Sequence, residues 1–516
     1  MEHTNDEKVE SILKDALIQF ESTLIRNSII NIHSDYFITS NAVKVPSISN
    51  VSNENILSLQ KKHIFTSPEC QDKIISCIDV NKSNGAIAVG LMSHGALDDH
   101  ILKSNRDDLS NYMYVWAELG TSSSPLKLLC PSECYVCKFH PEINDHIVVG
   151  CANGQVCLFD LNSKNLHDEV LPTYTGVAEK NHSHMVTDIF WLPLQSQIRN
   201  IGIDGNNGFG NHTNQFVTFG GGDVLMWDIR FQNIRARRKY KQGCDDNSWK
   251  PFFQIKPKRL HGSGEISIQR GMFFQDEHVL CVSESGDIIC IDVSPDSVLD
   301  HESSYLSNQF VKWVVEDKFS GSGCCCEVLC PSPFFPKYIL YINSWNFQVW
   351  NSDNMSDRMA PIFLRPQSTS RITCGCWSPS RPSLLYIGKA DGTIDVWEFL
   401  LSSFSPSLVI STKNTIMTMN ISRNVEDNRD LLIVGDDLGS VYTFLLPEVL
   451  TTPLAKEKEM MEQVLEMETS SQDSIPVSVL SIFDHSTLEE ELSEEKLCLS
   501  NEQESFYNDF CSKICD

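Results

Sequence analysis

The sequence predicts an all-β fold in which seven four-stranded sheets close into a ring, that is, a seven-bladed β-propeller with short flanking helices and an acidic C-terminal tail. Three observations lead to this prediction. A short phrase recurs along the chain, the spacing inside that phrase is constant, and the composition can fill a core. Of the 516 residues, 41% are hydrophobic and 21% are charged, which is typical of a globular protein.

The clearest copy of the recurring phrase is GKADGTIDVWEF, residues 388–399. Asp391 and Gly392 suit a tight hairpin turn, and Trp397 follows the glycine by five residues in the next strand. The same spacing occurs in four more copies, from Gly154 to Phe159, Gly222 to Trp227, Gly286 to Ile291 and Gly439 to Phe444. Two further copies keep only the strand end, at Trp116 and Trp350. Seven copies predict seven blades.

The residues that end these strands, together with one turn, are the structural positions that we expect to hold the blades: Trp116, Phe159, Asp160, Trp227, Asp228, Trp350, Asp391, Gly392 and Trp397. Consecutive strand ends are 43, 68, 64, 59, 47 and 47 residues apart. The shortest step fits a WD repeat, whose period is about 40–45 residues, so longer steps indicate surface insertions. Segments of loop-like composition at 195–215, 232–260 and 294–322 are the expected insertions.

The domain boundaries follow from the repeats. We expect the propeller over 71–447, closed by residues 63–67, which supply the outermost strand of the seventh blade. Residues 1–70 hold an amphipathic helix at 4–25 and a linker; that helix packs on the propeller or docks on a partner.

The C-terminal part, 448–516, is expected to hold a short helix at 456–468 and then a largely disordered tail. Apolar side chains share one side of this helix: Met460, Met461, Val464, Leu465 and Met467. The segment 451–516 is acidic, with 16 acidic and 4 basic residues. Low hydrophobicity and high charge favour disorder, so the tail is solvated or serves as an interaction segment.

Charge and cysteine content narrow the partners and the compartment. A net charge of −27 argues against nucleic-acid binding, which needs a basic face. There is no apolar run near 18 residues and no basic-then-apolar leader, so we expect neither a membrane span nor secretion, and a cytoplasmic location. In that reducing compartment the 19 cysteines are expected to be buried free thiols rather than a disulfide framework.

One group of residues resembles a zinc site. Cys130, Cys134, Cys137 and His140 have ligand-like spacing. Cys134 and Cys137, however, lie three residues apart in an alternating strand, which places their side chains on opposite faces of a sheet. We therefore expect no metal and no cofactor.

The sequence also lacks the common catalytic motifs. It has no HExxH, no GxSxG and no GxGxxG between a strand and a helix. A protein without enzymatic activity is the expectation. An active site assembled from scattered residues is the alternative that sequence leaves open.

Four phrases occur in a fixed order: SHMVTDIFWLP (183–193), FVTFGGGDVLMWDIR (216–230), SPFFPKYILYINSWNFQVW (332–350) and WSPSRPSLLYIGKADGTIDVWEFL (377–400). Together they resemble the intermediate-chain family of axonemal dyneins, especially its inner-arm branch. The third and fourth phrases are the most specific, through Pro333 and Phe334 and through Arg381 and Pro382. The resemblance covers about 74–446. The chain looks like a divergent member, because Ile291, Glu398 and Phe444 depart from the repeat pattern.

This resemblance implies a function. A family member is a non-catalytic scaffold that binds the dynein heavy chain, supports assembly or anchoring of the motor on the axoneme of cilia and flagella, and takes part in cilium movement. Dynein light chains and other intermediate chains are further implied partners. Family members usually recruit light chains through a long charged N-terminal region, whereas about 70 residues precede the first blade here. The alternative is a WD-repeat adaptor of another complex, such as a ubiquitin-ligase substrate receptor or a trafficking subunit.

A basic segment after the third strand end has two interpretations. It is either a solvated loop or a contact with an acidic partner, and its basic residues are Arg235, Arg237, Arg238 and Lys239. In an axonemal complex that partner would be tubulin, and hence the microtubule, or a motor subunit.

Overall fold

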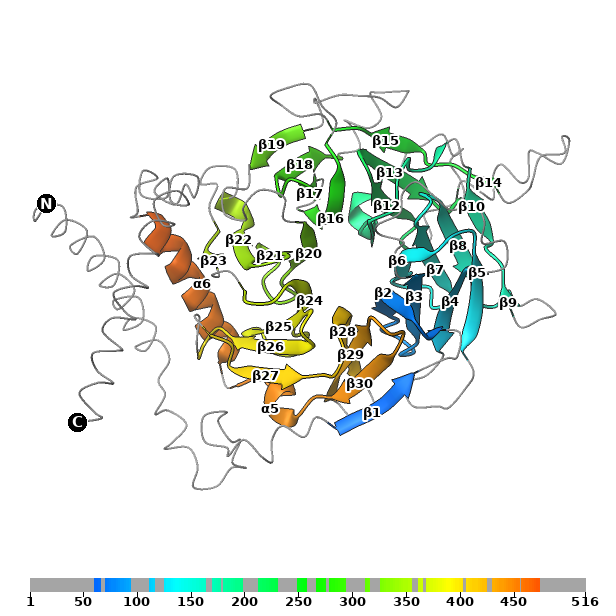
Figure 1. Ribbon diagram of the computed structural model, residues 1–516. Helices are drawn as coiled ribbons and strands as arrows, with labels where there is room; N and C mark the ends of the chain where they lie inside the picture. Colours follow the sequence, from blue (N-terminus) through cyan, green and yellow to red (C-terminus); the bar gives the residue numbers. More distant parts are fainter. Residues whose placement is uncertain are drawn as a thin grey trace, which may run out of the picture. The chain divides into compact units, whose positions relative to one another are not determined.

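Seven antiparallel sheets of four core strands are arranged around a common axis in this computed structural model (Figure 1). The structure describes residues 60–65, 70–93, 111–116, 125–163, 169–177, 180–197, 212–230, 248–257, 266–274, 278–293, 311–315, 325–354, 361–364, 368–401, 405–424, 429–454 and 456–473. The expected N-terminal helix at 4–25, the basic segment at 235–239 and the tail beyond residue 473 lie outside these ranges. The seven-bladed all-β prediction is confirmed.

The strands of the first four blades follow chain order from the axis outward. Blade 1 holds β2 (Lys73–Val80), β3 (Ile87–Ser93), β4 (Asn111–Trp116) and β5 (Leu126–Cys130). Blade 2 holds β6 (Cys134–Phe139), β7 (His146–Cys151), β8 (Val156–Asp160) and β10 (Tyr174–Gly176). Blade 3 holds β11 (Asp188–Trp191), β12 (Gln215–Gly220), β13 (Asp223–Asp228) and β15 (Phe253–Ile255). Blade 4 holds β16 (Ile268–Phe274), β17 (His278–Ser283), β18 (Ile288–Asp292) and β19 (Val311–Val315).

The remaining blades complete the ring. Blade 5 holds β20 (Cys326–Pro331), β21 (Tyr338–Asn343), β22 (Phe347–Asn351) and β23 (Phe363–Leu364). Blade 6 holds β24 (Ile372–Trp377), β25 (Leu384–Lys389), β26 (Thr393–Glu398) and β27 (Leu408–Ser411). Blade 7 holds β28 (Ile416–Asn424), β29 (Arg429–Asp436) and β30 (Val441–Leu445), with β1 (Gln60–Phe65) outside them.

Shorter elements flank these blades. Two-residue strands add to the rims of blades 1 and 2, where β9 (Glu169–Val170) pairs with β5 and β14 (Ser248–Trp249) pairs with β10. Short 3₁₀ turns occur at Leu194–Ser196 and Ser352–Asn354. Helices α5 (Glu448–Thr451) and α6 (Glu457–Asp473) follow the last blade. The chain divides into two compact units after residue 465. The first unit contains the propeller and the first half of α6.

The ring closes through its first strand. β1 pairs antiparallel with β30, with Ile64 opposite Tyr442 and Phe65 opposite Val441. Phe65 also packs against Trp116 of blade 1, with 5.5 Å between ring centroids. The closing strand expected around 63–67 is thus confirmed as Gln60–Phe65, and the ring uses residues that precede position 71.

Buried side chains from adjacent blades form the core. A blade is one sheet with two apolar faces, and stacking against both neighbours removes those faces from water. The second strands are buried along nearly their whole length, as in β21, where every residue is buried. Successive side chains of a strand point to opposite faces of the sheet, and both faces are covered by neighbouring blades. These strands are therefore continuous apolar runs rather than an alternating pattern.

The turn before the third strand of blade 7 requires a glycine at position 439, for two reasons. Gly439 has a φ of 81°, in the left-handed region, and a Cβ atom added there would lie 1.7 Å from the Cys70 carbonyl oxygen. The turn therefore approaches the segment between β1 and β2 closely. In blade 3 the residue with positive φ is Gly221 rather than Gly222, so the turn-to-Trp spacing is six residues there.

We predict that Gly439→Ala destabilises the protein by about 2 kcal/mol or more, because left-handed backbone costs a residue with a Cβ about 1–2 kcal/mol before any clash with the Cys70 carbonyl. Chemical denaturation measures this change. Leu438→Ala, at the exposed neighbouring position, is the control and should change stability little. Equal effects of the two substitutions would show that the close approach does not matter.

Candidate functional site

The expected blade positions lie on equivalent third strands. Trp116 ends β4, Asp160 ends β8 and Asp228 ends β13. Asp391 and Gly392 form the turn between β25 and β26. The large side chains at these strand ends are all buried: Trp116 (4% exposed), Phe159 (0%), Trp227 (0%), Trp350 (2%) and Trp397 (7%). Each therefore contributes to the packing between blades.

Blade 3 holds a directional chain of hydrogen bonds around Trp227. Its indole Nε1 donates to the Thr218 hydroxyl at 2.9 Å, and that hydroxyl lies 2.7 Å from His182 Nε2. His182 Nδ1 lies 3.2 Å from the Gly220 carbonyl oxygen, which can only accept, so the proton sits on Nδ1 and Nε2 accepts from Thr218. All three side chains are buried. Sequence reasoning missed His182 and Thr218, although a His ahead of the first strand is a WD-repeat signal.

The thiols of blades 1 and 2 correct an expectation. Cys134 and Cys137 were expected on opposite faces, which is wrong, because the pairing register of β6 shifts between Cys134 and Val136. Both side chains approach Cys77, whose Sγ lies 3.9 Å from that of Cys134 and 3.4 Å from that of Cys137. A bulge adds one residue to a strand and thereby changes which side chains share a face.

The other two members of that group lie elsewhere. His140 Nδ1 accepts from the backbone N–H groups of Glu142 and Ile143, and its Nε2 contacts the Thr213 carbonyl oxygen at 2.6 Å. The Cys130 thiol instead neighbours that of Cys151. Within the described ranges no group of three or more His, Cys, Asp or Glu side chains is arranged to hold a metal ion, and the cysteines there are free thiols. No helix of the described part is long and apolar enough to span a membrane.

A buried ion cluster joins blade 6 to the C-terminal segment. Arg381 is 1% exposed and contacts two carboxylates, Glu398 at 2.5 Å and Glu457 of α6 at 3.0 Å. Arg381 Nη1 also donates to the Val449 carbonyl oxygen at 2.8 Å. Burial raises the pKa of Glu398, and the Arg381 guanidinium opposes that rise.

Further donors hold the Glu457 carboxylate. It accepts from the Ser383 hydroxyl at 2.6 Å and from the Leu454 backbone N–H at 2.7 Å. Buried carboxylates are stable only when paired and hydrogen-bonded in this way. This cluster therefore fixes the first turn of α6 against blade 6.

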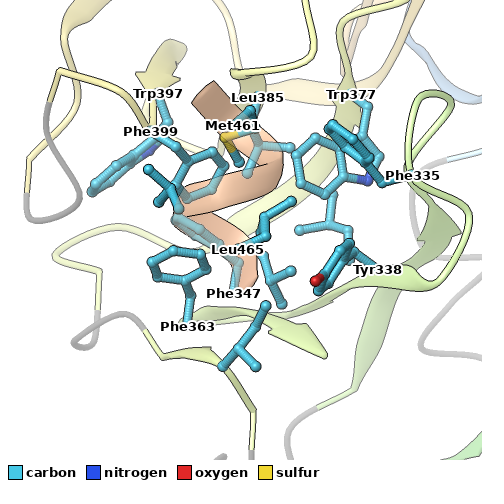
Figure 2. Packing of buried hydrophobic residues seen from close by; sticks show 14 of the residues in the cluster. Phe335, Tyr338, Phe347, Phe363, Trp377, Leu385, Trp397, Phe399, Met461 and Leu465 are labelled. Carbon is cyan, nitrogen blue, oxygen red and sulfur yellow. The ribbon is translucent and has the colours of Figure 1, made fainter. Parts of the chain in front are cut away.

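An apolar cluster continues the same contact. A helix was expected at 456–468, and α6 spans Glu457–Asp473. Of the five residues expected on its apolar side, Met461, Val464 and Leu465 are buried and Met460 is partly buried. Figure 2 shows Met461 and Leu465 among aromatic rings of blades 5 and 6. The buried aromatic residues of this cluster are Phe335, Tyr338, Phe347, Phe363, Trp377, Trp397 and Phe399.

The seat of α6 is thus built from the two most specific phrases in the sequence. Phe334 and Phe335 belong to residues 332–350, and Arg381 belongs to residues 377–400. Sequence reasoning identified these phrases but not their partner, since Glu457 is 76 residues from Arg381. The arrangement attaches the first half of α6, from Glu457 to Leu465, to blades 5 and 6.

The expected partner-contact residues Arg235, Arg237, Arg238 and Lys239 lie outside the described ranges. Arg230, at the end of blade 3, is described. Its guanidinium pairs with the fully buried side chain of Asp228 at 2.6 Å, so this residue closes a strand end.

Comparison with known proteins gives a family match. The model of the family "Dynein axonemal intermediate chain 3 WD40 domain" matches residues 59–177 and 281–446, together more than half of the chain. These ranges contain blades 1 and 2 and most of blades 4–7. The family model leaves 178–280 unmatched, which includes blade 3.

Three curated relatives illustrate the similarity. "Dynein axonemal intermediate chain 3" of Danio rerio is 23% identical over 65% of this chain and 42% of its own length. "Dynein intermediate chain 3, ciliary" of Heliocidaris crassispina is 22% identical over 90% of this chain and 67% of its own. "Dynein, 70 kDa intermediate chain, flagellar outer arm" of Chlamydomonas reinhardtii is 22% identical over 71% of this chain and 56% of its own. The chain thus matches between about two fifths and two thirds of these relatives' lengths.

Among solved structures, a chain from "Crystal Structure of Mitotic Checkpoint Complex" aligns with a TM-score of 0.49 and 12% identity. It covers 79% of this chain and 97% of that chain.

We predict that Arg381→Met destabilises the protein by about 3–5 kcal/mol, because it leaves two buried carboxylates without their cation. Denaturant titration measures the loss, and limited proteolysis should show earlier cleavage near α6. Glu459→Gln, at an exposed position on the same helix, is the matched control. A loss no larger than that of the control would argue against the ion cluster as the anchor.

Trp397→Ala is expected to cost about 3–5 kcal/mol, since Trp397 is 7% exposed and packs on Phe347 with 5.1 Å between centroids. Trp345→Ala provides a comparison at a site that is 37% exposed, and its cost should be about 1 kcal/mol or less. Thermal melting of both variants tests the difference. Unchanged melting of Trp397→Ala would refute a structural role for this position.

A pH prediction follows from His182, whose pKa burial lowers from 6.5 to about 4. The unfolded chain binds this proton first, so the stability that the neutral imidazole contributes is complete above pH 6.5 and is lost as the pH falls towards 4. The loss over this interval is about 3 kcal/mol, at about 1.4 kcal/mol per pKa unit.

Stability measured from pH 7 to 4 should therefore fall less steeply in His182→Gln than in the unaltered chain. His184→Gln changes an exposed histidine of the same loop and serves as the control. Parallel pH profiles for the unaltered chain and His182→Gln would contradict the prediction.

Proposed function

We propose that this chain, which belongs to the dynein axonemal intermediate chain 3 WD40 domain family, is a non-catalytic subunit of an axonemal dynein complex in cilia or flagella. The observation that carries the proposal is the family match over most of the propeller, from the closing strand to the seventh blade. Relatives that are named as ciliary and flagellar dynein intermediate chains support it. The inner-arm assignment stays a prediction, because a relative named for an outer arm is also among the matches.

The finer proposal concerns what the propeller does in that complex. It binds the dynein heavy chain and supports assembly or anchoring of the motor on the axoneme. A rigid ring suits this role, because a preformed surface loses little conformational entropy on binding. In this proposal the strand-end and turn residues keep the ring rigid: Trp116, Phe159, Asp160, Trp227, Asp228, Trp350, Asp391, Gly392 and Trp397.

The C-terminal segment adds to the rigidity of the ring. Glu457, in the first turn of α6, pairs with Arg381 of blade 6, and the buried side chains up to Leu465 pack on blades 5 and 6. Light chains and other intermediate chains are further proposed partners.

Affinity purification from ciliated cells tests the proposal. A tagged chain should recover dynein heavy chain in amounts comparable to itself from axonemal extract, and microscopy should place it on the axoneme. The control is Glu459→Gln, at an exposed position of α6, which should leave the recovery of heavy chain unchanged. Recovery of ubiquitin-ligase or coat subunits without any dynein heavy chain would exclude the proposed complex.

We further predict that the basic segment contributes to binding through charge. Replacing Arg235, Arg237, Arg238 and Lys239 with Ala should weaken binding at low salt and flatten its salt dependence, because exposed charges are screened within about 10 Å at 0.1 M salt. Binding measured from 50 to 300 mM NaCl checks this. Identical salt profiles for the two chains would show that the segment is a solvated loop.

A further inference from the structure

The boundary between blades 2 and 3 is filled by a tryptophan from an added segment. β14 pairs parallel with the outer strand of blade 2, with Ser248 opposite Thr175 and Trp249 opposite Gly176. The Trp249 ring is 2% exposed and lies 4.9 Å from that of Trp227, the strand-end tryptophan of blade 3. It also packs on Phe216 at 5.4 Å. A short extended segment at the rim can thus bury an indole against the next blade.

The corresponding boundary between blades 5 and 6 contains a pocket. Trp397, the strand-end tryptophan of blade 6, lines a pocket of about 290 Å³ together with Phe347 of blade 5. Two exposed apolar residues stand at this pocket, Trp345 (37% exposed) and Val409 (49% exposed). This volume is just below that of typical ligand pockets, about 300–1,000 Å³, and suits one large side chain.

One of the residues that line the pocket is a buried carboxylate. Asp395 lines it, is 8% exposed and pairs through Oδ2 with Lys389 at 3.0 Å. Its other oxygen, Oδ1, is buried and has no hydrogen-bond partner. An unpaired buried carboxylate oxygen is costly, so a ligand that donates an N–H there gains a charge-assisted hydrogen bond.

The charges in the pocket narrow the ligand class. Lys389 and Asp395 neutralise each other in an ion pair. This pair therefore favours neither a cationic nor an anionic ligand. The aromatic walls favour an aromatic ring, through offset or edge-to-face contacts. Among aromatic side chains, an indole combines a large apolar surface with one N–H donor and no acceptor.

We propose that this pocket binds a tryptophan side chain presented by a short extended segment of a partner protein. The indole occupies the boundary between blades 5 and 6 as Trp249 occupies the boundary between blades 2 and 3. It stacks between Trp345 and Trp397, and its N–H donates to Asp395 Oδ1. The proposal does not depend on which complex the chain joins, because it rests on the pocket and on the filled equivalent within the same ring.

Selection from a displayed library of random 12-residue peptides tests the proposal with the full chain. Selected peptides should contain a tryptophan, and replacing it with Phe should weaken binding at least about 10-fold, the loss of one hydrogen bond to a charged group. Val409→Glu should weaken binding by a similar factor, because it places a charge at the mouth of the pocket. Leu438→Glu, an exposed apolar site on blade 7, is the matched control.

Melting temperatures separate binding from folding, since Val409 and Leu438 are both exposed and neither substitution should change them much. The proposal is overturned if selection yields no peptide that distinguishes the unaltered chain from Val409→Glu, or if the peptides that do so lack a tryptophan. Sedimentation adds a separate outcome. Self-association that Val409→Glu abolishes would make a second copy of this chain the occupant, and would also refute the proposal.

Discussion

Closure of the ring through β1 is the constraint on which the rest of the structure depends. No blade of this protein buries both of its faces alone, and each obtains its second buried face from a neighbour. Blade 7 in turn receives its outer strand from the beginning of the propeller, through the pairing of β1 with β30. Pairing strands about 380 positions apart links the first and last blades, so loss of this contact exposes edges on both. The close approach of Gly439 to Cys70 lies at the same junction.

Buried polar groups give the ring specific positions that hydrophobic packing alone would not. The hydrogen-bond chain from Trp227 through Thr218 to His182 has one direction, because each donor has a single suitable acceptor. The cluster of Arg381, Glu398 and Glu457 likewise permits one placement of the first turn of α6. Such groups need not add net stability, since desolvation offsets their attraction. What they add is a large penalty for any other arrangement.

The boundaries between blades differ in what fills them, and this difference relates the fold to function. Between blades 2 and 3 a segment of the chain itself supplies Trp249. Between blades 5 and 6 the seat of α6 uses Phe335, Tyr338 and Trp377, whereas the pocket beside Trp397 and Val409 stays accessible. The proposed role in a motor complex needs both properties, a ring that does not deform and surfaces that remain available to partners.

The sequence by itself determined the number of blades and the closing strand, because the spacing from turn to strand end repeats along the chain and a ring must take its last strand from its own beginning. It also determined the apolar side of α6, from helical spacing. Only the tertiary structure decided three other features. The register shift in β6 brought Cys134 and Cys137 to the same thiol, which strict alternation did not predict. The partner Glu457 of Arg381 and the partner His182 of Thr218 come from distant positions in the chain, 76 and 36 residues away, so no spacing rule identifies them. Trp227 and Trp397 occupy equivalent strand ends, but Trp249 of β14 packs on Trp227, whereas Trp397 lines a pocket. The strand ends alone do not predict this difference.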